Sequence, residues 1–212
     1  MRLAIFGATG KTGIELVRQG LAQGHSIACL VRNPATDNLP TAVTQIHGDV
    51  RDADAVARTI EGSDAVLSAI GSRSLRETGL LDSASANILA GMDNNGVRRL
   101  IVLGAAGAGL SGLDRNQSAL SRIGFAIIRS TLLKRPFEDQ TAQEHRLEAS
   151  NVDYTVVRPP RLTNSPFTGR YRIDADTLPP AANSTSRADV ADFMLKQLSD
   201  ERFVRRGVYI AR

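Results

Sequence analysis

Hydrophobic positions in the first half of the chain follow two alternating patterns. Short, nearly continuous apolar runs predict buried strands at residues 2–6, 26–31, 45–47, 65–70 and 100–103. Between them, apolar residues recur every three or four positions and predict helices over residues 11–23, 52–60 and 81–94. Strands and helices that alternate at this interval are typical of a doubly wound parallel sheet, because two parallel strands need a long crossover between them.

The second half of the chain is less regular. We expect helices over residues 118–134, 136–150 and 186–198, and strands over residues 152–157, 169–173 and 208–210. Ser186 is placed to cap the last helix, and Pro136 suits the first turn of its helix. No repeat or convincing linker interrupts the sequence. Residues 1–212 are therefore expected to form one α/β domain, with about residues 155–212 contributing a small substrate-side lobe.

A glycine-rich segment joins the first expected strand to the first expected helix. Its members are Gly7, Ala8, Thr9, Gly10, Lys11, Thr12 and Gly13. Three glycines spaced by two residues allow a tight turn, let a pyrophosphate approach the backbone and let the helix pack on the strand. The first amides of the helix then face the phosphates, so the segment predicts a dinucleotide site. A Walker loop is excluded, because Lys11 directly follows Gly10 and only two residues separate Gly10 from Gly7.

The end of the second expected strand indicates which dinucleotide binds. Enzymes that use NAD commonly place an acid there for the ribose hydroxyls, whereas those that use NADP offer an arginine. Here the strand ends at Arg32, and the next acid is Asp37. Arg32, helped by Lys11 or Thr12, is predicted to bind the adenosine 2′-phosphate, so NADP(H) should be preferred over NAD(H). The alternative is a solvated surface arginine.

Two further strand ends supply candidate cofactor contacts. Asp49 could accept a hydrogen bond from the adenine amino group while Val50 packs against the ring, or Asp49 could instead cap the helix that begins near residue 52. Ala69, Ile70 and Gly71 end the fourth expected strand at the carboxyl edge, where ligands lie in such sheets.

Composition narrows the range of partners. The chain has 26 Lys and Arg against 22 Asp and Glu, a net charge of +4, and only three of the basic residues are Lys. Acids are interleaved with the arginines, and nine aromatic residues without Trp leave little for stacking exposed bases, so a nucleic-acid partner is not expected. No apolar run approaches the ~18 residues of a membrane span, and no signal-peptide pattern precedes the first strand. A cytoplasmic protein with no membrane partner is expected.

Few residues invite metal, thiol or imidazole chemistry. The single cysteine, Cys29, has apolar neighbours that indicate a buried thiol, and no group of His and carboxylate residues has metal-ligand spacing. His25 follows the first helix and is expected to act as a favourable cation at its C-terminus. For His145 a solvated helix face and a titrating role both stay open.

Six segments of the chain, in order, resemble one known family. They are GATGKTG, LVRNP, GDVRDADAV, SDAVLSAIG, TVVRPP and SRADVADFML. Together they resemble the atypical short-chain dehydrogenase/reductases, and in particular the NAD(P)H-binding proteins related to the biliverdin-IXβ/flavin reductase and the NmrA-like proteins. The resemblance covers nearly the whole chain. It implies a Rossmann fold, NADP(H) bound at residues 7–13, 32 and 49–50, and often the reduction of flavins or tetrapyrroles.

The chain departs from that family at its catalytic positions. Most short-chain dehydrogenases use a Tyr-x-x-x-Lys pair, but none of the three tyrosines (Tyr154, Tyr171, Tyr209) has Lys four residues later. Tyr154 lies in an expected strand and should be packed. The related reductase has Ser after its fifth strand and His after the proline pair, and here those places hold Ala105 and Arg161. No side-chain acid is therefore assigned, and biliverdin is not favoured as the substrate.

Hydride transfer from NADPH to a flavin needs no side-chain acid, because the flavin can be protonated from solvent. Ala105 is expected beside the cofactor, and Ala106, Gly107 and Gly109 would leave room for a flat acceptor ring, unless this segment is simply a tight loop. Arg161 and Arg170, with Arg172 nearby, are expected to pair with an anionic group of the acceptor. Surface salt bridges are the alternative for each.

The sequence thus predicts an NADPH-dependent reductase that transfers hydride to a planar small-molecule acceptor. Free flavin is the first candidate for the acceptor, and a quinone or a tetrapyrrole is the alternative acceptor for the same site. The alternative is an NADP(H)-binding redox sensor of the NmrA-like type that turns over little. Either a monomer or a homodimer is compatible with the pattern.

Overall fold

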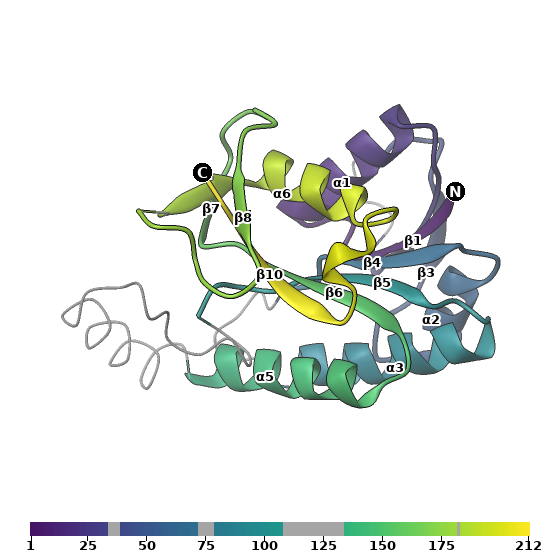
Figure 1. The fold of residues 1–212 in the computed structure, drawn as a ribbon. Coiled ribbons are helices and arrows are strands. Elements are labelled where there is room, and N and C mark those ends of the chain that lie inside the picture. The colour runs from purple at the N-terminus through teal and green to yellow at the C-terminus, as the bar shows by residue number, and fades with distance from the viewer. Residues whose placement is uncertain (34–38, 72–78, 108–133, 182) are drawn as a thin grey trace.

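The computed structural model describes residues 1–33, 39–71, 79–107, 134–181 and 183–212 (Figure 1). Its central sheet has eight strands in the order β3-β2-β1-β4-β5-β6-β10-β8. All pairs along this sheet are parallel except β10 with β8. The strands are β1 (Arg2–Phe6), β2 (Ser26–Val31), β3 (Thr44–His47), β4 (Ala65–Ser68), β5 (Arg99–Leu103), β6 (Asp153–Arg158), β8 (Arg172–Asp174) and β10 (Arg206–Ala211).

Helices cover both faces of the sheet. Helices α1 (Lys11–Ala22) and α6 (Arg187–Lys196) pack together on one face, and α2 (Ala53–Ile60), α3 (Leu80–Asn94) and α5 (Lys134–Ala149) lie on the other (Figure 1). The predicted doubly wound parallel sheet is therefore confirmed. None of the helices in the described residues combines the length and apolarity that crossing a membrane requires.

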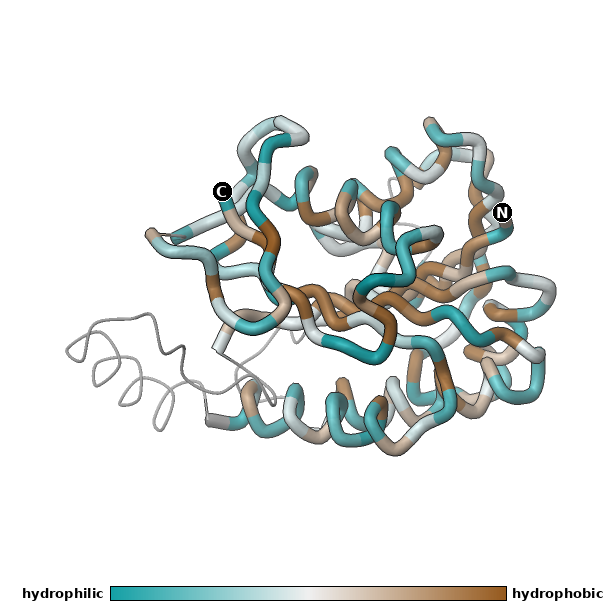
Figure 2. The backbone as a smooth tube through the Cα atoms, in the orientation of Figure 1, coloured by the Kyte–Doolittle hydropathy of each residue, from teal (hydrophilic) through white to brown (hydrophobic). Residues whose placement is uncertain are grey.

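The apolar runs follow from burial on both faces. In β1, Leu3 and Ile5 join the cluster under α1 and α6, while Ala4 and Phe6 join the cluster under α2 and α3. A strand covered on both sides is apolar at every position rather than at alternate ones. Figure 2 shows this as continuous brown along the inner strands, whereas the helices alternate in colour.

The structure differs from the expected elements mainly in the second half. Strands β7 (Arg161–Thr163) and β9 (Ser184–Ser186) form a separate parallel pair that was not predicted. Strand β8 begins three residues later than expected, β10 is longer at both ends, and β4 stops at Ser68, two residues early. The expected helix 118–134 lies outside the described residues except for Lys134, which begins α5. Pro136 lies in the first turn of α5, as predicted, and Ser186 caps α6.

Candidate functional site

The glycine turn lies between β1 and α1. Gly7 has φ +77°, and a Cβ there would come within 2.6 Å of the Ala69 carbonyl oxygen. A Cβ on Gly13 would overlap the Gly7 carbonyl oxygen, and the Gly10 amide donates to that same oxygen at 3.0 Å. The turn is thus tight against both β4 and its own helix, which explains why glycine stands at these positions.

The N-terminus of α1 differs from the starts of α2, α3 and α6. Its N-cap is Gly10, no side chain caps its first amides, and its first turn carries no acid. By contrast, Asp52 caps α2, Ser186 caps α6, and Asp139 of α5 accepts from the first amides of α3. The amides at the start of α1 therefore keep both their donors and the positive end of the helix dipole available for an anion.

A cavity of about 110 Å³ opens beside this helix start, over the carboxyl ends of β1, β2, β3 and β4. This cavity is lined by residues that the sequence predicted to contact the phosphates, the adenine and the ribose of a dinucleotide. Its lining residues are Phe6, Gly7, Thr9, Gly10, Leu30, Arg32, Gly48, Asp49, Val50, Ala69, Ile70, Gly71 and Leu80. After β4 ends at Ser68, the Ala69 amide still donates to the Phe6 carbonyl oxygen at 2.9 Å, and Ala69, Ile70 and Gly71 line the cavity.

Other candidate cofactor residues do not line this cavity. Thr12 and Gly13 are buried at the start of α1, Lys11 is exposed, and Ala105 follows β5 further along the sheet. Arg32 is thus the one basic side chain among the described lining residues. Help from Thr12 in binding a 2′-phosphate is not supported, because that side chain is only 5% exposed.

Asp49 has a local partner. Its Oδ1 accepts from the Arg51 backbone amide at 2.9 Å and lies 3.7 Å from Nη1 of Arg51 in a half-exposed ion pair. The alternative that Asp49 caps α2 is wrong, because Asp52 does so through hydrogen bonds from the amides of Asp54 and Ala55. The role of Asp49 toward adenine stays a prediction.

The sequence analysis missed Phe6, Leu30, Gly48 and Leu80 as cavity residues. Phe6 and Leu30 stand near the ends of β1 and β2, so the rule that ligands lie at carboxyl ends could have identified them. Gly48 packs too closely on Ala55 to carry a side chain, since a Cβ would overlap the Ala55 Cβ. Leu80 reaches the cavity from the start of α3, which no local pattern reveals.

The predicted acceptor residues lie apart from the cavity. The Ala106 amide donates to the Pro159 carbonyl at 2.8 Å, and its side chain packs against Leu178 and Tyr209. Arg161 and Arg170 are exposed, and neither guanidinium has a hydrogen bond or ion pair within the described part of the chain. Gly109 lies outside the described residues.

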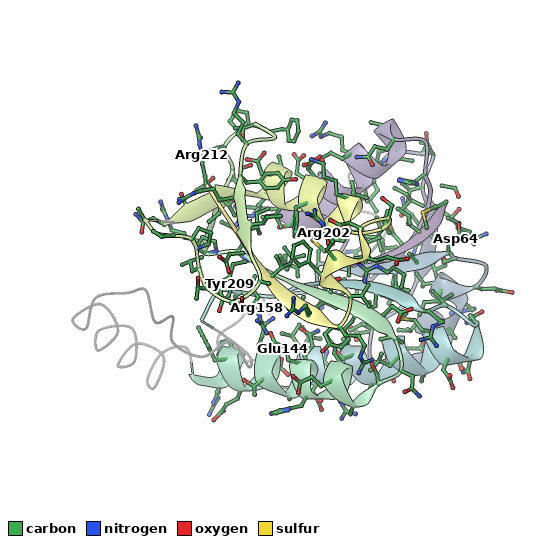
Figure 3. The ribbon with its side chains drawn as sticks, viewed as in Figure 1. Asp64, Glu144, Arg158, Arg202, Tyr209 and Arg212 are labelled. Carbon is green, nitrogen blue, oxygen red and sulfur yellow. The ribbon has the colours of Figure 1, made fainter. Side chains whose placement is uncertain are left out.

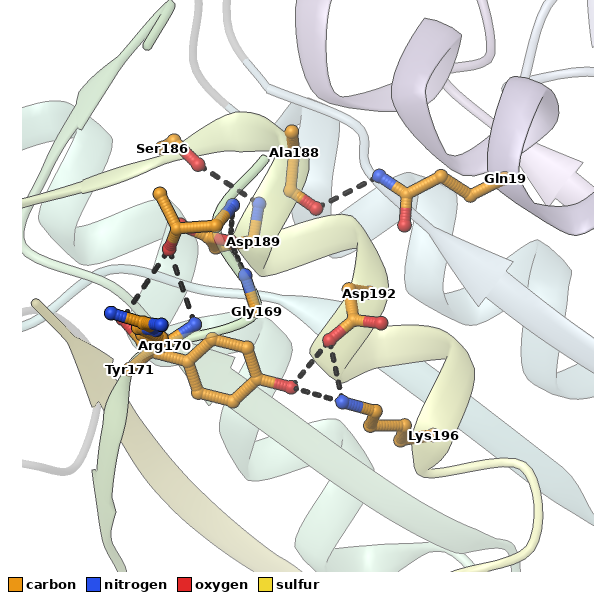
Figure 4. A network of polar contacts seen from close by, with 10 residues as sticks. Gln19, Gly169, Arg170, Tyr171, Ser186, Ala188, Asp189, Asp192 and Lys196 are labelled. Carbon is orange, nitrogen blue, oxygen red and sulfur yellow. Dashed lines mark hydrogen bonds and ion pairs between the residues drawn. The ribbon is translucent and has the colours of Figure 1, made fainter. Parts of the chain in front are cut away.

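The side chain of Tyr171 contacts Lys196, which ends α6, although the two residues are far apart in sequence (Figure 4). The Tyr171 hydroxyl donates to Asp192 Oδ2 at 2.6 Å and accepts from Lys196 Nζ at 3.1 Å. Burial and the bond to Asp192 raise the pKa of Tyr171 to about 12. Such a hydroxyl is a poor proton donor at neutral pH, and it does not line the cavity, so this pair does not replace the missing Tyr-x-x-x-Lys.

The remaining titratable candidates behave as packing or surface groups. Cys29 is fully buried, and burial raises the pKa of its thiol to about 12, which confirms the inert thiol. Tyr154 is buried as predicted. His145 is exposed beside Glu148, on a solvated face of α5. The expectation for His25 is wrong, because burial and the N-terminal charge lower its pKa and disfavour the cation. The described residues hold no cluster of three metal-ligating side chains.

Comparison with known proteins agrees with this geometry. The Photosystem II assembly factor Ycf39 of Synechocystis is 24% identical over 165 residues, covering 74% of this chain and 44% of the relative. The first curated relatives are longer proteins, of which the match spans 12% to 44%.

Solved structures share the fold over the whole chain. A short-chain dehydrogenase/reductase of Veillonella parvula in complex with NADP matches with a TM-score of 0.79 at 22% identity, covering 100% of this chain and 94% of that one. ChuY, an anaerobilin reductase from Escherichia coli O157:H7, matches with a TM-score of 0.78 at 19% identity, covering 100% and 97%. The family described as NAD(P)H-binding matches residues 7–201, and the chain belongs to this family.

Proposed function

We propose that this protein is an NADPH-dependent reductase that transfers hydride to a planar acceptor, with free flavin as the first candidate. One observation carries the proposal: the uncapped start of α1 opens onto a cavity whose only described basic side chain is Arg32. That combination fits a pyrophosphate on the helix amides and a 2′-phosphate on the guanidinium.

The same cavity suits the rest of the adenosine half. Leu30, Val50 and Leu80 offer apolar surface for an adenine ring, and Asp49 lies beside them as a hydrogen-bond acceptor. Val50 is held in place, since Asn87 Nδ2 donates to its carbonyl oxygen at 2.9 Å. The reduced nicotinamide would then lie beyond β4, towards the end of β5.

Bound NADPH would supply the hydride itself, so the chain's task is to hold an acceptor ring against it. The acceptor gains two electrons, and its proton comes from solvent because no side-chain acid is assigned. Ala105 and Ala106 leave little bulk at the end of β5. The exposed guanidinium groups of Arg161 and Arg170, which have no partner among the described residues, can meet an anionic acceptor. ChuY, which shares this fold and is named as an anaerobilin reductase, supports a reductase role.

A second candidate is an NADP(H)-binding redox sensor with little turnover. Two observations favour it: the chain lacks the Tyr-x-x-x-Lys pair, and one relative, Ycf39, is named as an assembly factor rather than as an enzyme. Such a protein would use the same cavity but transmit cofactor occupancy to a partner.

One assay separates the two candidates. The purified chain is mixed with NADPH and FMN without oxygen, and NADPH oxidation is followed at 340 nm. We expect a rate well above that of a protein-free mixture. Tight NADPH binding with no oxidation by FMN, FAD, a quinone or biliverdin would leave the sensor, and absence of NADPH binding would overturn both proposals.

A further inference from the structure

The buried face of α5 is unusually polar. Of its buried residues, Asp139, Gln140, Gln143 and Glu144 are each at most 8% exposed, and only Leu147 is apolar. Burying a polar side chain in a helix that packs on a sheet is unfavourable unless hydrogen bonds compensate. A helix that breaks the usual apolar pattern in this way is a candidate for a functional role.

Three of these side chains bind α5 to α3 and β6 through hydrogen bonds or an ion pair. Asp139 accepts from the Leu81 amide at 2.9 Å, and Gln143 Nε2 donates to Ser85 Oγ at 3.0 Å. Glu144 forms a buried ion pair with Arg158 at 2.8 Å, and Arg158 lies between Glu144 and Tyr209 (Figure 3). Gly207 makes room for that guanidinium, because a Cβ there would overlap it.

Gln140 is the exception. Its side chain is 8% exposed, and its Nε2 is buried without a hydrogen-bond partner in the described structure. A buried donor left without an acceptor destabilises the fold, so its presence calls for an explanation. The contacts of Asp139, Gln143 and Glu144 hold α5 against its neighbours, so the position of the helix does not depend on a hydrogen bond from Gln140.

Gln140 lies at the end of the sheet where the acceptor is expected. A Cβ on Gly104, the residue after β5, would come within 3.1 Å of Gln140 Nε2. The Gly104 amide donates to the Val157 carbonyl at 2.8 Å, which places this spot at the carboxyl ends of β5 and β6. The cofactor cavity lies over β3, β2, β1 and β4, so Gln140 stands beyond its β4 side.

We propose that Gln140 hydrogen-bonds the acceptor, donating from its side-chain amide to a ring carbonyl oxygen. This rests on the proposed reductase function and extends it by naming a contact residue. The terminal torsion of a glutamine is soft, so the amide can turn from Gly104 towards a ring over residues 104–107. An acceptor that takes up hydride gains negative charge on its conjugated carbonyl, and a neutral N–H donor stabilises that charge without becoming a proton source.

The test replaces Gln140 with Leu, which keeps the volume and removes the donor. Gln197→Leu is the matched control, because Gln197 is fully buried with both amide atoms unpartnered and lies beyond the C-terminal end of α6, away from the cavity. Three dissociation constants are measured: adenosine 2′,5′-bisphosphate, NADP⁺, and FMN with the NADP⁺-loaded protein. Gln140→Met repeats the measurement if the Leu variant does not fold.

We expect Gln140→Leu to weaken FMN binding about fivefold to tenfold, the effect of one hydrogen bond, with the other two constants changed less than twofold. Gln197→Leu should leave all three unchanged. Weaker NADP⁺ binding in the Gln140 variant would assign the side chain to the cofactor and overturn the proposal, as would unchanged FMN binding. If the wild-type protein binds no adenosine 2′,5′-bisphosphate, the proposed function fails first and takes this inference with it.

Discussion

Arg32 and Asp49 face the same cavity with opposite charges. An acid at this place would favour the ribose hydroxyls of NAD, but the Asp49 carboxylate already accepts from the Arg51 amide. Arg32 is exposed and has no recorded ion pair within the described residues, so it is available to a 2′-phosphate. This difference between two single residues is the basis of the proposed preference for NADPH over NADH.

Arg32→Asp should therefore weaken NADPH binding by about tenfold or more and change NADH binding far less, because a charge-assisted phosphate contact contributes about 1.5–3 kcal/mol. The check is isothermal titration with both nucleotides. Arg206→Asp makes the same charge change as a control, because Arg206 is exposed at the start of β10, at the amino ends of the parallel strands and away from the cavity. Equal losses for NADPH and NADH in Arg32→Asp would contradict the assignment.

Single residues also show where sequence reasoning stops. Gly7, Gly10, Arg32, Asp49 and Val50 were predictable as neighbours in space, because each follows a strand whose carboxyl end meets the same edge. The contact between Tyr171 and Lys196 could not be predicted from the sequence, because it depends on how residues 164–171 lie against α6. That position is set by Asp189, which accepts from the amides of Thr168 and Gly169 (Figure 4).

Helix α1 can pack closely against the turn after β1 only because Gly13 has no side chain. A Cβ on Gly13 would overlap backbone atoms of Gly7 and Ala8, which cannot move without shifting the whole turn. Gly20 is also buried and lies about two turns further along α1. A Cβ there would meet only flexible side-chain ends, Ile27 Cδ1 at 3.1 Å and Leu195 Cδ2 at 3.8 Å. A side chain at Gly13 would therefore meet rigid backbone, whereas one at Gly20 would meet side chains that can move.

Gly13→Ala should destabilise the protein by roughly 1–3 kcal/mol and weaken NADPH binding, because the start of α1 must move away from the turn. Gly20→Ala should be near neutral or slightly stabilising, since Ala is favoured over Gly within helices by about 1 kcal/mol. Thermal unfolding with and without NADPH measures both effects. A Gly13 variant with unchanged stability and affinity would show that the turn is not tight in solution.

Elements with a strong apolar signal were predictable, and those without it were not. Strands β1, β2, β4 and β5 are covered on both faces, so their sequences are apolar apart from one polar residue at an end of each. Strands β7 and β9 have three residues each and carry Arg, Thr and Ser, so neither period nor composition identifies them. Helix α5 was expected from its spacing, but its polar buried face depends on partners in α3 and β6.

For the molecule as a whole, several carboxylates are better stabilised when folded. Burial opposes ionisation of Asp189, but amides of Thr168 and Gly169 outweigh it and lower its pKa. Hydrogen bonds from Arg146 and Arg202 lower the pKa values of Asp82 and Asp200. A carboxyl whose folded pKa is depressed contributes stability above its unfolded pKa, about 4, and loses it as the pH falls through the folded value.

The melting temperature should therefore fall as the pH drops below about 4, and Asp189→Asn should lower it already at pH 7 and flatten the acid dependence. An Asn at 189 keeps one oxygen for the two amides but loses the negative charge that they stabilise and the second oxygen, which accepts from the Thr168 hydroxyl, so a loss of about 1–3 kcal/mol is expected. Calorimetry at pH 7, 5 and 3 tests this, with the exposed Asp93→Asn as control. Parallel pH curves for Asp189→Asn and the wild type would contradict the role of Asp189.

The place of β10 has a consequence for biosynthesis. Its residues, Arg206–Ala211, fill an interior position between β6 and β8, although they are the last of the sheet to be translated. While they are still inside the ribosome, β6 has an open parallel edge and β8 has no partner in the sheet. An unpaired edge of this kind can recruit other strands. The nascent chain is therefore least protected in the interval before β10 emerges, when chaperone contact would matter most.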